Sequence, residues 1–290
     1  MHNNHKPFFG PAGNAESFFL AGNKSSLEAP SWLNSLGLDC YEYQCGHGVR
    51  ISDDAAEILG ERAKENNILL SIHAPYYISL SSKEVEKRDR SVEYIMQTLR
   101  AAKKMGADRI VVHMGSCASM PRKMAMQLTE ETLYRSLDQA EKEGLADIFI
   151  CPETMGKLNQ LGDVDEIIQI CKMSDRLIPT IDFGHVNART LGGLKEKSDF
   201  AVILNALEKR LSPYKAQNFH AHYSRIEYTK AGEKKHHTFS ETQYEPDFEP
   251  LAELLAERGL SPRIICESAG TQAEDSVELK KIFERKLEDL

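Results

Sequence analysis

The sequence has only six cysteines, and none of the spacings that would give them a shared role. There is no CxxC motif and no pattern typical of a disulfide framework. Cys40, Cys151 and Cys266 lie within or beside apolar runs of strand length. We therefore expect reduced, buried thiols in a cytoplasmic protein.

Long apolar runs and internal linkers are also missing from the 290 residues. No stretch is long and apolar enough to cross a bilayer, so we expect no membrane-spanning segment. The polar N-terminus, Met1 to Pro7, lacks the apolar core of a signal peptide. No segment rich in Pro, Gly or Ser divides the chain, which predicts a single domain over residues 1–290.

An excess of positive charge is absent as well, because the net charge is −8 at pH 7. This balance gives no general attraction to nucleic acid or to an anionic membrane, so a nucleic-acid partner would need a local basic surface. Cations in loops near the expected site could hold phosphates, although glutamates are mixed among them. These cations are Arg122, Lys123, Lys157, Arg189, Arg225, Lys230, Lys234 and Lys235.

Short apolar runs alternate with longer amphipathic stretches along the whole chain, which predicts alternating strands and helices. The expected strands cover residues 7–10, 40–44, 68–72, 109–112, 148–151, 177–181, 218–221 and 263–266. The expected helices cover residues 26–36, 53–66, 83–104, 129–143, 164–173, 200–211, 248–257 and 273–290. Four of these helices end at a glycine, which tolerates the left-handed conformation of a helix C-cap. These glycines are Gly37, Gly106, Gly144 and Gly259.

Eight strand–helix units in one chain of this length predict an α/β fold of the (βα)8 or TIM-barrel type. In such a barrel the active site lies at the C-terminal ends of the strands. A doubly wound open sheet is the alternative. It is disfavoured because no GxGxxG motif follows the first strand.

Residues of metal-ligand type follow the apolar runs. In Thr180-Ile-Asp-Phe-Gly-His-Val-Asn187, Asp182 and His185 stand where a strand is expected to end and a loop to begin. Because parallel strands of a barrel end at one face, we expect these side chains to form a ring. One such residue alone would be explained by a structural hydrogen bond or ion pair, but the repetition favours a functional site. The set is His73, His113, Glu153, Asp182, His185, His220, His222 and Glu267.

A ring of this composition predicts bound metal. Carboxylates buried together without a cation would have raised pKa values and would cost stability. Mixed imidazole and carboxylate ligands suit Zn, Mn, Fe or Co better than Mg or Ca. The imidazoles are too many for one ion that also has carboxylate ligands, so two or three ions fit better. The pair His236 and His237, in what we expect to be a long loop, is either a further ligand source or part of a solvated surface.

Several stretches carry a resemblance to a known family. They are Ile-His-Ala-Pro-Tyr-Tyr at His73, Val-Val-His-Met-Gly-Ser at His113, Pro-Glu-Thr at Glu153, Ile-Asp-Phe-Gly-His-Val-Asn-Ala at Asp182 and His185, Phe-His at His220, Lys-Lys-His-His at His236 and Cys-Glu-Ser at Glu267. With them the chain resembles the endonuclease IV family of AP endonucleases, within the xylose isomerase-like barrels. The match runs over nearly the whole chain.

The resemblance implies DNA base-excision repair. The family cleaves the DNA backbone 5′ to an abasic site with a zinc-activated hydroxide, so the expected partner is DNA containing abasic sites and the expected cofactor is two to three zinc ions. Glu153 and Glu267 are the expected catalytic carboxylates. The implied ligands are His73, His113 and Glu153 for the first zinc, Glu153, Asp182, His220 and Glu267 for the second, and His185 and His236 for the third.

Two stretches depart from the family pattern. The family has an Asp two residues before the His that matches His236, and this position is Lys234 here, with Glu233 beside it. A protonated Lys cannot ligate a metal, so a filled third site would need Glu233. The DNA-inserting stretch of the family is replaced by Gln44-Cys-Gly-His-Gly-Val-Arg50. The expected DNA contacts are Tyr76, Arg50, Lys234 and Lys235.

Two other functions are compatible with the same residues. A sugar isomerase or epimerase of the same superfamily needs one divalent ion, manganese for example, held by two Glu, an Asp and a His. Glu153, Asp182, His220 and Glu267 would serve, with the Glu pair moving a proton beside a carbonyl. A barrel that has lost catalysis and only binds a ligand is the third possibility. Nothing in the sequence decides the oligomeric state, and we favour a monomer.

Overall fold

The computed structural model describes residues 6–117 and 120–290. Eight parallel strands form a closed ring at its centre. Two four-stranded sheets, β1-β10-β7-β6 and β2-β3-β4-β5, make up the ring. Parallel bridges between Ala12 and Glu42, and between Glu153 and Thr180, join the two sheets at both edges. The strands are β1 (Phe8–Pro11), β2 (Cys40–Gln44), β3 (Leu69–His73), β4 (Arg109–Val112), β5 (Phe149–Pro152), β6 (Thr180–Asp182), β7 (His220–Tyr223) and β10 (Arg263–Cys266).

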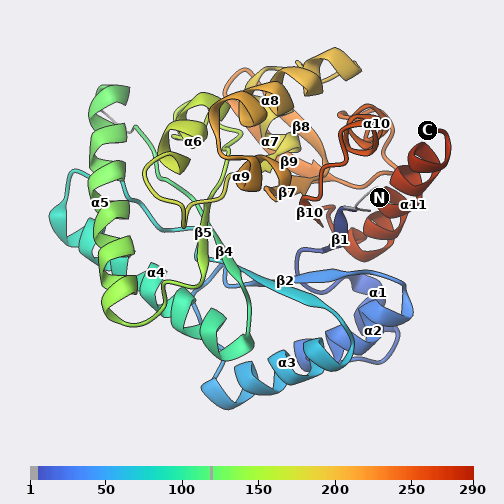
Figure 1. Cartoon of the computed structure of the whole chain (residues 1–290), viewed down its shortest axis with the longest axis horizontal. Coiled ribbons are helices and arrows are strands. Elements are labelled where there is room, and N and C mark those ends of the chain that lie inside the picture. The colour runs from blue at the N-terminus through green and yellow to red at the C-terminus, as the bar shows by residue number, and fades with distance from the viewer. Residues whose placement is uncertain (1–5, 118–119) are drawn as a thin grey trace.

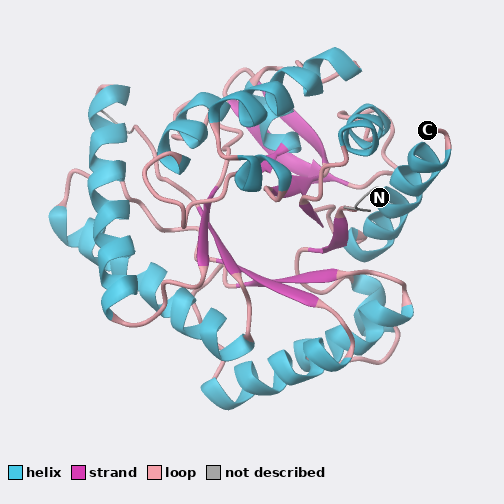
Figure 2. Cartoon of the chain, in the orientation of Figure 1, coloured by secondary structure: helices cyan, strands magenta, loops and turns pink. Residues whose placement is uncertain are grey.

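Helices surround this ring on all sides (Figures 1 and 2). The helices are α1 (Glu16–Leu20), η1 (Ser26–Glu28), α2 (Ala29–Ser35), α3 (Asp53–Glu65), α4 (Val85–Met105), α5 (Arg122–Lys142), α6 (Val164–Cys171), α7 (Phe183–Arg189), α8 (Lys197–Arg210), α9 (Pro213–Gln217), α10 (Glu249–Arg258) and α11 (Gln272–Glu288). The predicted (βα)8 barrel is therefore confirmed. The glycines at the four helix ends all have the expected left-handed backbone, with φ between 60° and 72°.

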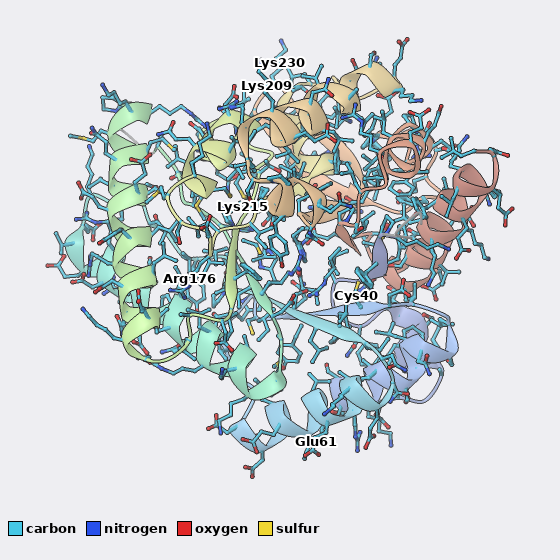
Figure 3. The ribbon with its side chains drawn as sticks, viewed as in Figure 1. Cys40, Glu61, Arg176, Lys209, Lys215 and Lys230 are labelled. Carbon is cyan, nitrogen blue, oxygen red and sulfur yellow. The ribbon has the colours of Figure 1, made fainter. Side chains whose placement is uncertain are left out.

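We predicted a long loop after β7, but the structure has regular secondary structure there. The segment forms an antiparallel hairpin of β8 (Arg225–Thr229) and β9 (Gly232–His237). The hairpin was missed because its strands are mostly polar, and only Ile226 supplies a large buried apolar side chain. Lys230, at the hairpin turn, lies at the outer edge of the molecule (Figure 3). Helix α7 was also missed, because it begins at once after β6 where we expected a loop.

Apolar side chains pack between the strand ring and the helices. Phe9 of β1 contacts Phe283 of α11 and Phe248 beside α10, with ring centroids 5.9 and 6.3 Å apart, so the two ends of the chain share one core. The six cysteines are free thiols, and Cys40, Cys151 and Cys266 are buried as predicted. Cys40 lies on the inner side of the strand ring (Figure 3). None of the described helices is long and apolar enough to span a membrane.

Charged residues occupy the end of the barrel where the strands begin, which we call the barrel floor (Asp108, Arg109 and Arg263). Arg263 Nη1 donates to Asp108 Oδ1 at 2.8 Å, and Arg109 Nη2 donates to Asp108 Oδ2 at 3.2 Å. Both guanidinium groups are buried. The floor therefore holds two buried cations against one carboxylate.

Candidate metal centre

The opposite end of the barrel gathers the residues predicted from the strand ends. His73 is the last residue of β3 and Asp182 the last of β6, while His113, Glu153 and Glu267 directly follow β4, β5 and β10. Apart from Asp182, which lies behind them, these residues line a pocket of about 270 Å³. The pocket is lined by His73, Tyr76, His113, Glu153, Met155, Lys157, Gln160, His185, Glu233, His236 and Glu267.

Glu153 stands at the centre of this site and is 1% exposed. Its Oε2 atom lies 2.9 Å from His113 Nε2 and 3.3 Å from His73 Nε2. Its Oε1 atom faces the other way, 3.1 Å from His222 Nδ1 and 3.4 Å from His185 Nδ1. The two oxygens of one carboxylate thus serve two separate sets of histidines, which is the arrangement of a bridging ligand.

Potential ligand atoms form several compact groups around Glu153, with all atoms of a group within 4.8 Å of one another. These groups are His73, His113 and Glu153; His73, His222 and Glu267; Glu153, Asp182, His222 and Glu267; and His185, Glu233 and His236. Tetrahedral zinc sites use imidazole nitrogens and carboxylate oxygens of this kind. The described residues could therefore hold metal.

Asp182 combines a structural and a site role. Its Oδ1 atom accepts from the backbone N–H of His185 at 2.8 Å and so caps α7, which aims His185 into the pocket. The ring of His185 is held in turn, because its Nδ1 atom lies 2.9 Å from the carbonyl oxygen of Thr154. Asp182 Oδ2 is buried and accepts no hydrogen bond from the described residues, although His185 Nδ1 lies 2.9 Å away. A buried carboxylate oxygen that accepts no hydrogen bond is what a cation site would leave in its absence.

The β8–β9 hairpin supplies Glu233 and His236 to the group that they form with His185, and a β-bulge sets the direction of their side chains. Glu227 of β8 is opposite Lys235 and Tyr228 is opposite Glu233, so Lys234 is the extra residue of β9. The bulge turns both Glu233 and His236 toward His185, although they are three residues apart. Glu233 Oε2 lies 3.4 Å from His185 Nε2, and the rings of His236 and His185 are 5.3 Å apart.

Close contact with the loop after β5 holds Glu233 in place. A Cβ atom at Gly156 would lie 2.5 Å from the Cβ of Glu233, so this position has no room for a side chain. His236 Nδ1 also forms a hydrogen bond with Ser224 Oγ at 2.8 Å. Glu233, and not Lys234, therefore brings a carboxylate to His185 and His236.

His220 lies outside the group in which we predicted it. We predicted it as a ligand together with Asp182 and Glu267, whereas in the structure the ligand atoms of His222 lie close to those of Asp182 and Glu267. The predicted strand ended at residue 221, whereas β7 continues to Tyr223, so His220 lies one layer deeper on the same face of the strand. His220 is completely buried, and its Nε2 atom is 3.0 Å from Glu42 Oε2. Glu42 was not predicted at all.

Burial and opposite charges shift the pKa values in this site strongly. Burial would raise the pKa of Glu153, but the charges of His113 and His222 outweigh it and hold that pKa well below its ordinary value. Burial would lower the pKa of His73, but Glu153 raises it to about 9. Burial raises the pKa of Glu267. Carboxylates and protonated imidazoles therefore neutralise one another, and a cation would take the place of the protons.

His220 behaves differently from the other site histidines. Burial is the dominant influence and lowers its pKa to about 3, despite the nearby carboxylate of Glu42. In contrast, burial would lower the pKa of His222, but the charges of Glu267 and Glu42 raise it well above its ordinary value. His220 is therefore a neutral ring beneath the pocket, and His222 belongs to the charged group above it.

The predicted DNA contacts lie at the rim. Tyr76 is 57% exposed, and its ring meets His47 edge to face at 5.5 Å between centroids. Arg50 and Lys235 are exposed, and neither forms an ion pair within the described part of the chain. Lys234 points away from the pocket and pairs with Glu227 at 2.5 Å.

Other cations at the rim already form ion pairs or hydrogen bonds with neighbouring segments of the chain. Arg122 pairs with Glu166, and Arg189 donates to the carbonyl oxygens of Met155 and Lys157 at 3.2 and 2.9 Å. The basic surface expected from the sequence is therefore smaller than the number of its cations suggested.

Relatives by sequence fall into two kinds. An uncharacterised protein of Methanocaldococcus jannaschii is 31% identical over 260 residues, which cover 90% of this chain and 92% of that protein. A probable endonuclease 4 of Acholeplasma laidlawii is 30% identical over 118 residues, which cover 40% of this chain and 39% of that protein. The chain thus matches well under half the length of this endonuclease.

Solved structures with the same fold have different activities. Endonuclease IV from Thermus thermophilus superposes with a TM-score of 0.69 at 18% identity, covering 98% of this chain and 100% of that one. A D-tagatose 3-epimerase-like protein superposes with a TM-score of 0.64 at 23% identity, covering 87% and 89%. A family model described as the xylose isomerase-like TIM barrel matches residues 30–285. The chain belongs to the xylose isomerase-like TIM barrel family.

Proposed function

We propose that this protein is a metal-dependent hydrolase that cleaves the DNA backbone 5′ to abasic sites, with two to three zinc ions. The observation that carries the proposal is the position of Glu153, whose two oxygens face separate histidine sets. A third group of His185, Glu233 and His236 adjoins them. Three adjacent groups of imidazoles and carboxylates suit a multinuclear centre better than a single ion.

Each group has a part in this proposal. His73 and His113 would hold one ion with Glu153, while Asp182, His222 and Glu267 would hold a second with the same carboxylate. His185, Glu233 and His236 would hold a third. Bound zinc supplies activated water and positive charge for phosphodiester hydrolysis. The free oxygen of Asp182 and the four buried or half-buried carboxylates of the site support this assignment.

The rim would position the DNA. The exposed ring of Tyr76 stands at the pocket mouth, where an aromatic face can stack on a base or fill the gap at an abasic site. Lys157 at the pocket edge and Lys235 on the hairpin can approach phosphate oxygens. Because the net charge of the chain is −8, such local contacts would provide the attraction to DNA.

A sugar epimerase is the second candidate, supported by a specific observation. Glu153, Asp182, His222 and Glu267 form one compact group that could hold a single manganese ion, and the fold is shared with a D-tagatose 3-epimerase-like protein. Two glutamates could then move a proton beside a carbonyl. This function gives no metal-binding role to the histidines of the other groups, which line the pocket where a sugar would bind.

The decisive experiment measures metal content and incision on the same purified protein. We expect two or three zinc ions per chain and cleavage of a duplex that carries one abasic site. Glu153→Gln should lose incision, and Glu131→Gln, an exposed carboxylate on α5, should keep it. One ion per chain, no incision, and epimerisation of a ketose with manganese would establish the epimerase instead. Bound metal without either reaction would leave a binding protein.

A further inference from the structure

A carboxylate that the proposed hydrolase does not use lies directly beneath the pocket. Glu42 of β2 is completely buried. In the strand ring, β2 is separated from β7 by β1 and β10, so a contact between β2 and β7 crosses the barrel interior. Glu42 makes such contacts: its Oε1 atom is 3.1 Å from His222 Nε2, and its Oε2 atom is 3.0 Å from His220 Nε2.

Glu42 is itself held in place from its own side of the barrel. Ser71 Oγ donates to Glu42 Oε2 at 3.0 Å, and Gln44 Nε2 donates to Oε1 at 3.2 Å. A carboxylate buried away from water is stable only when its oxygens are paired. Each oxygen of Glu42 therefore faces one imidazole and one hydrogen-bond donor.

We propose that Glu42 is a positioning residue that fixes the orientation of His222 for metal binding; this rests on the proposed metal centre. Glu42 Oε1 lies 3.1 Å from Nε2 of His222, and although the two atoms do not form a hydrogen bond of good geometry, the negative charge of the carboxylate favours the proton of His222 on that nitrogen. The other nitrogen, Nδ1, then keeps its lone pair for a cation. This is the atom that lies 3.1 Å from Glu153 Oε1 and 3.5 Å from Glu267 Oε1. Metal-binding histidines commonly have a carboxylate behind them in this way.

His220 completes the arrangement on the other side of Glu42. Its Nε2 atom lies 3.0 Å from the second oxygen of Glu42 and so helps to hold the carboxylate in place. The rings of His220 and His222 meet edge to face at 5.1 Å, which leaves little freedom for His222 to rotate. His222 is thus enclosed by Glu42, His220 and the ligands above it.

A separate ion held by Glu42, His220 and His222 is the competing interpretation, because their ligand atoms also lie within reach of one another. It is disfavoured on two grounds. The oxygens of Glu42 already accept hydrogen bonds from Ser71 and Gln44. An ion there would also require His222 to bind metal through both ring nitrogens, and so to lose its remaining proton.

The test is Glu42→Gln in the full-length chain. An amide has one acceptor oxygen for two imidazoles and presents N–H groups in place of the other, so His222 loses its fixed orientation. Competition with a chromophoric chelator should show zinc binding weakened by about 10-fold to 100-fold for one ion. Glu42→Asp, which keeps the carboxylate, should recover part of the loss. Thr180→Val, which removes a buried hydroxyl from β6, is the matched control and should bind zinc as the wild type does.

A second measurement needs no substitution. In ¹⁵N spectra of the zinc-loaded wild type, His222 should carry a proton on Nε2 and none on Nδ1. A proton on Nδ1 would overturn the proposal, and so would unchanged zinc affinity in Glu42→Gln. Loss of one whole ion in Glu42→Gln, with the others unaffected, would make Glu42 a ligand instead. A wild type that binds no zinc would overturn the proposed function as well, whereas the preceding outcomes leave that function intact.

Discussion

The barrel floor offers a direct measurement of how one carboxylate supports the fold. Asp108 lies between two guanidinium groups whose residues, Arg109 and Arg263, are only 6% and 3% exposed. Arginine stays protonated in proteins, so neither group can escape its burial by losing a charge. We predict that Asp108→Asn destabilises the folded chain, because it leaves two buried cations without a neutralising partner.

The size of the effect follows from the pKa of Asp108. Burial would raise this pKa, but the charges of Arg263 and Arg109 outweigh burial and lower it from 3.8 to about 2. A depression of that size corresponds to about 2.5 kcal/mol of stabilisation. Because the side chain of Asp108 is 46% exposed, screening by water reduces the expected contribution to about 1 kcal/mol.

The pH dependence tests the cause of the effect. Since the folded-state pKa lies below the unfolded value, the stabilisation is complete above about pH 4 and is lost as the pH falls toward 2. Denaturant unfolding of wild type and Asp108→Asn should therefore differ by about 1 kcal/mol at pH 7 and converge near pH 2. Asp147→Asn is the control, because it removes an exposed pair with Lys103 and should change stability less. Equal stabilities at pH 7, or a difference that persists at pH 2, would refute the reasoning.

Backbone clearance, rim charge and metal loading each give a further test. Gly10→Ala should prevent stable folding, because its Cβ would lie 1.8 Å from the carbonyl oxygen of Cys40. Gly144→Ala has free space around the added Cβ and should cost only about 1 kcal/mol of stability, which thermal unfolding would measure. Lys235→Ala should reduce by about one the slope of log affinity for duplex DNA against log salt concentration, and Lys234→Ala, whose ammonium is already paired, should reduce it less. A chelator should lower the unfolding midpoint and zinc should restore it, and equal midpoints would contradict a metal centre.

The barrel and most of its site residues could be predicted from the sequence. The strands at 109–112 and 263–266 coincide with β4 and β10, because short, strongly apolar runs are typical of strands buried on both faces. The His or Glu that follows such a run is then placed at the site by the barrel geometry alone. This holds for His113 and Glu267, which needed no three-dimensional information.

The errors have a common physical cause in residues that lie on the same face of a strand. His220 and His222 both point inward, and only the true end of β7 tells which of them lies beside Glu153, Asp182 and Glu267. Glu42 is hidden in the same way, since Cys40-Tyr-Glu-Tyr-Gln44 looks like a half-exposed strand although its glutamate faces the barrel interior. Glu233 was named from the sequence as the residue that a filled third site would need, but the β-bulge that brings it beside His185 changes the side-chain alternation without a sequence signal.

The cap at the start of α7 restricts how Asp182 can meet a metal ion. One of its oxygens accepts a hydrogen bond from the backbone of the helix, and the other, beside His185 Nδ1, accepts none from the described residues. Asp182 would offer a cation at this position one oxygen whose direction is already fixed. Binding of the cation would therefore not have to order the Asp182 side chain. Such monodentate ligation suits the low coordination number of zinc. It disfavours calcium, which takes six to eight oxygens and often both from one carboxylate. The first turn of a short helix would thereby influence which metal the protein selects.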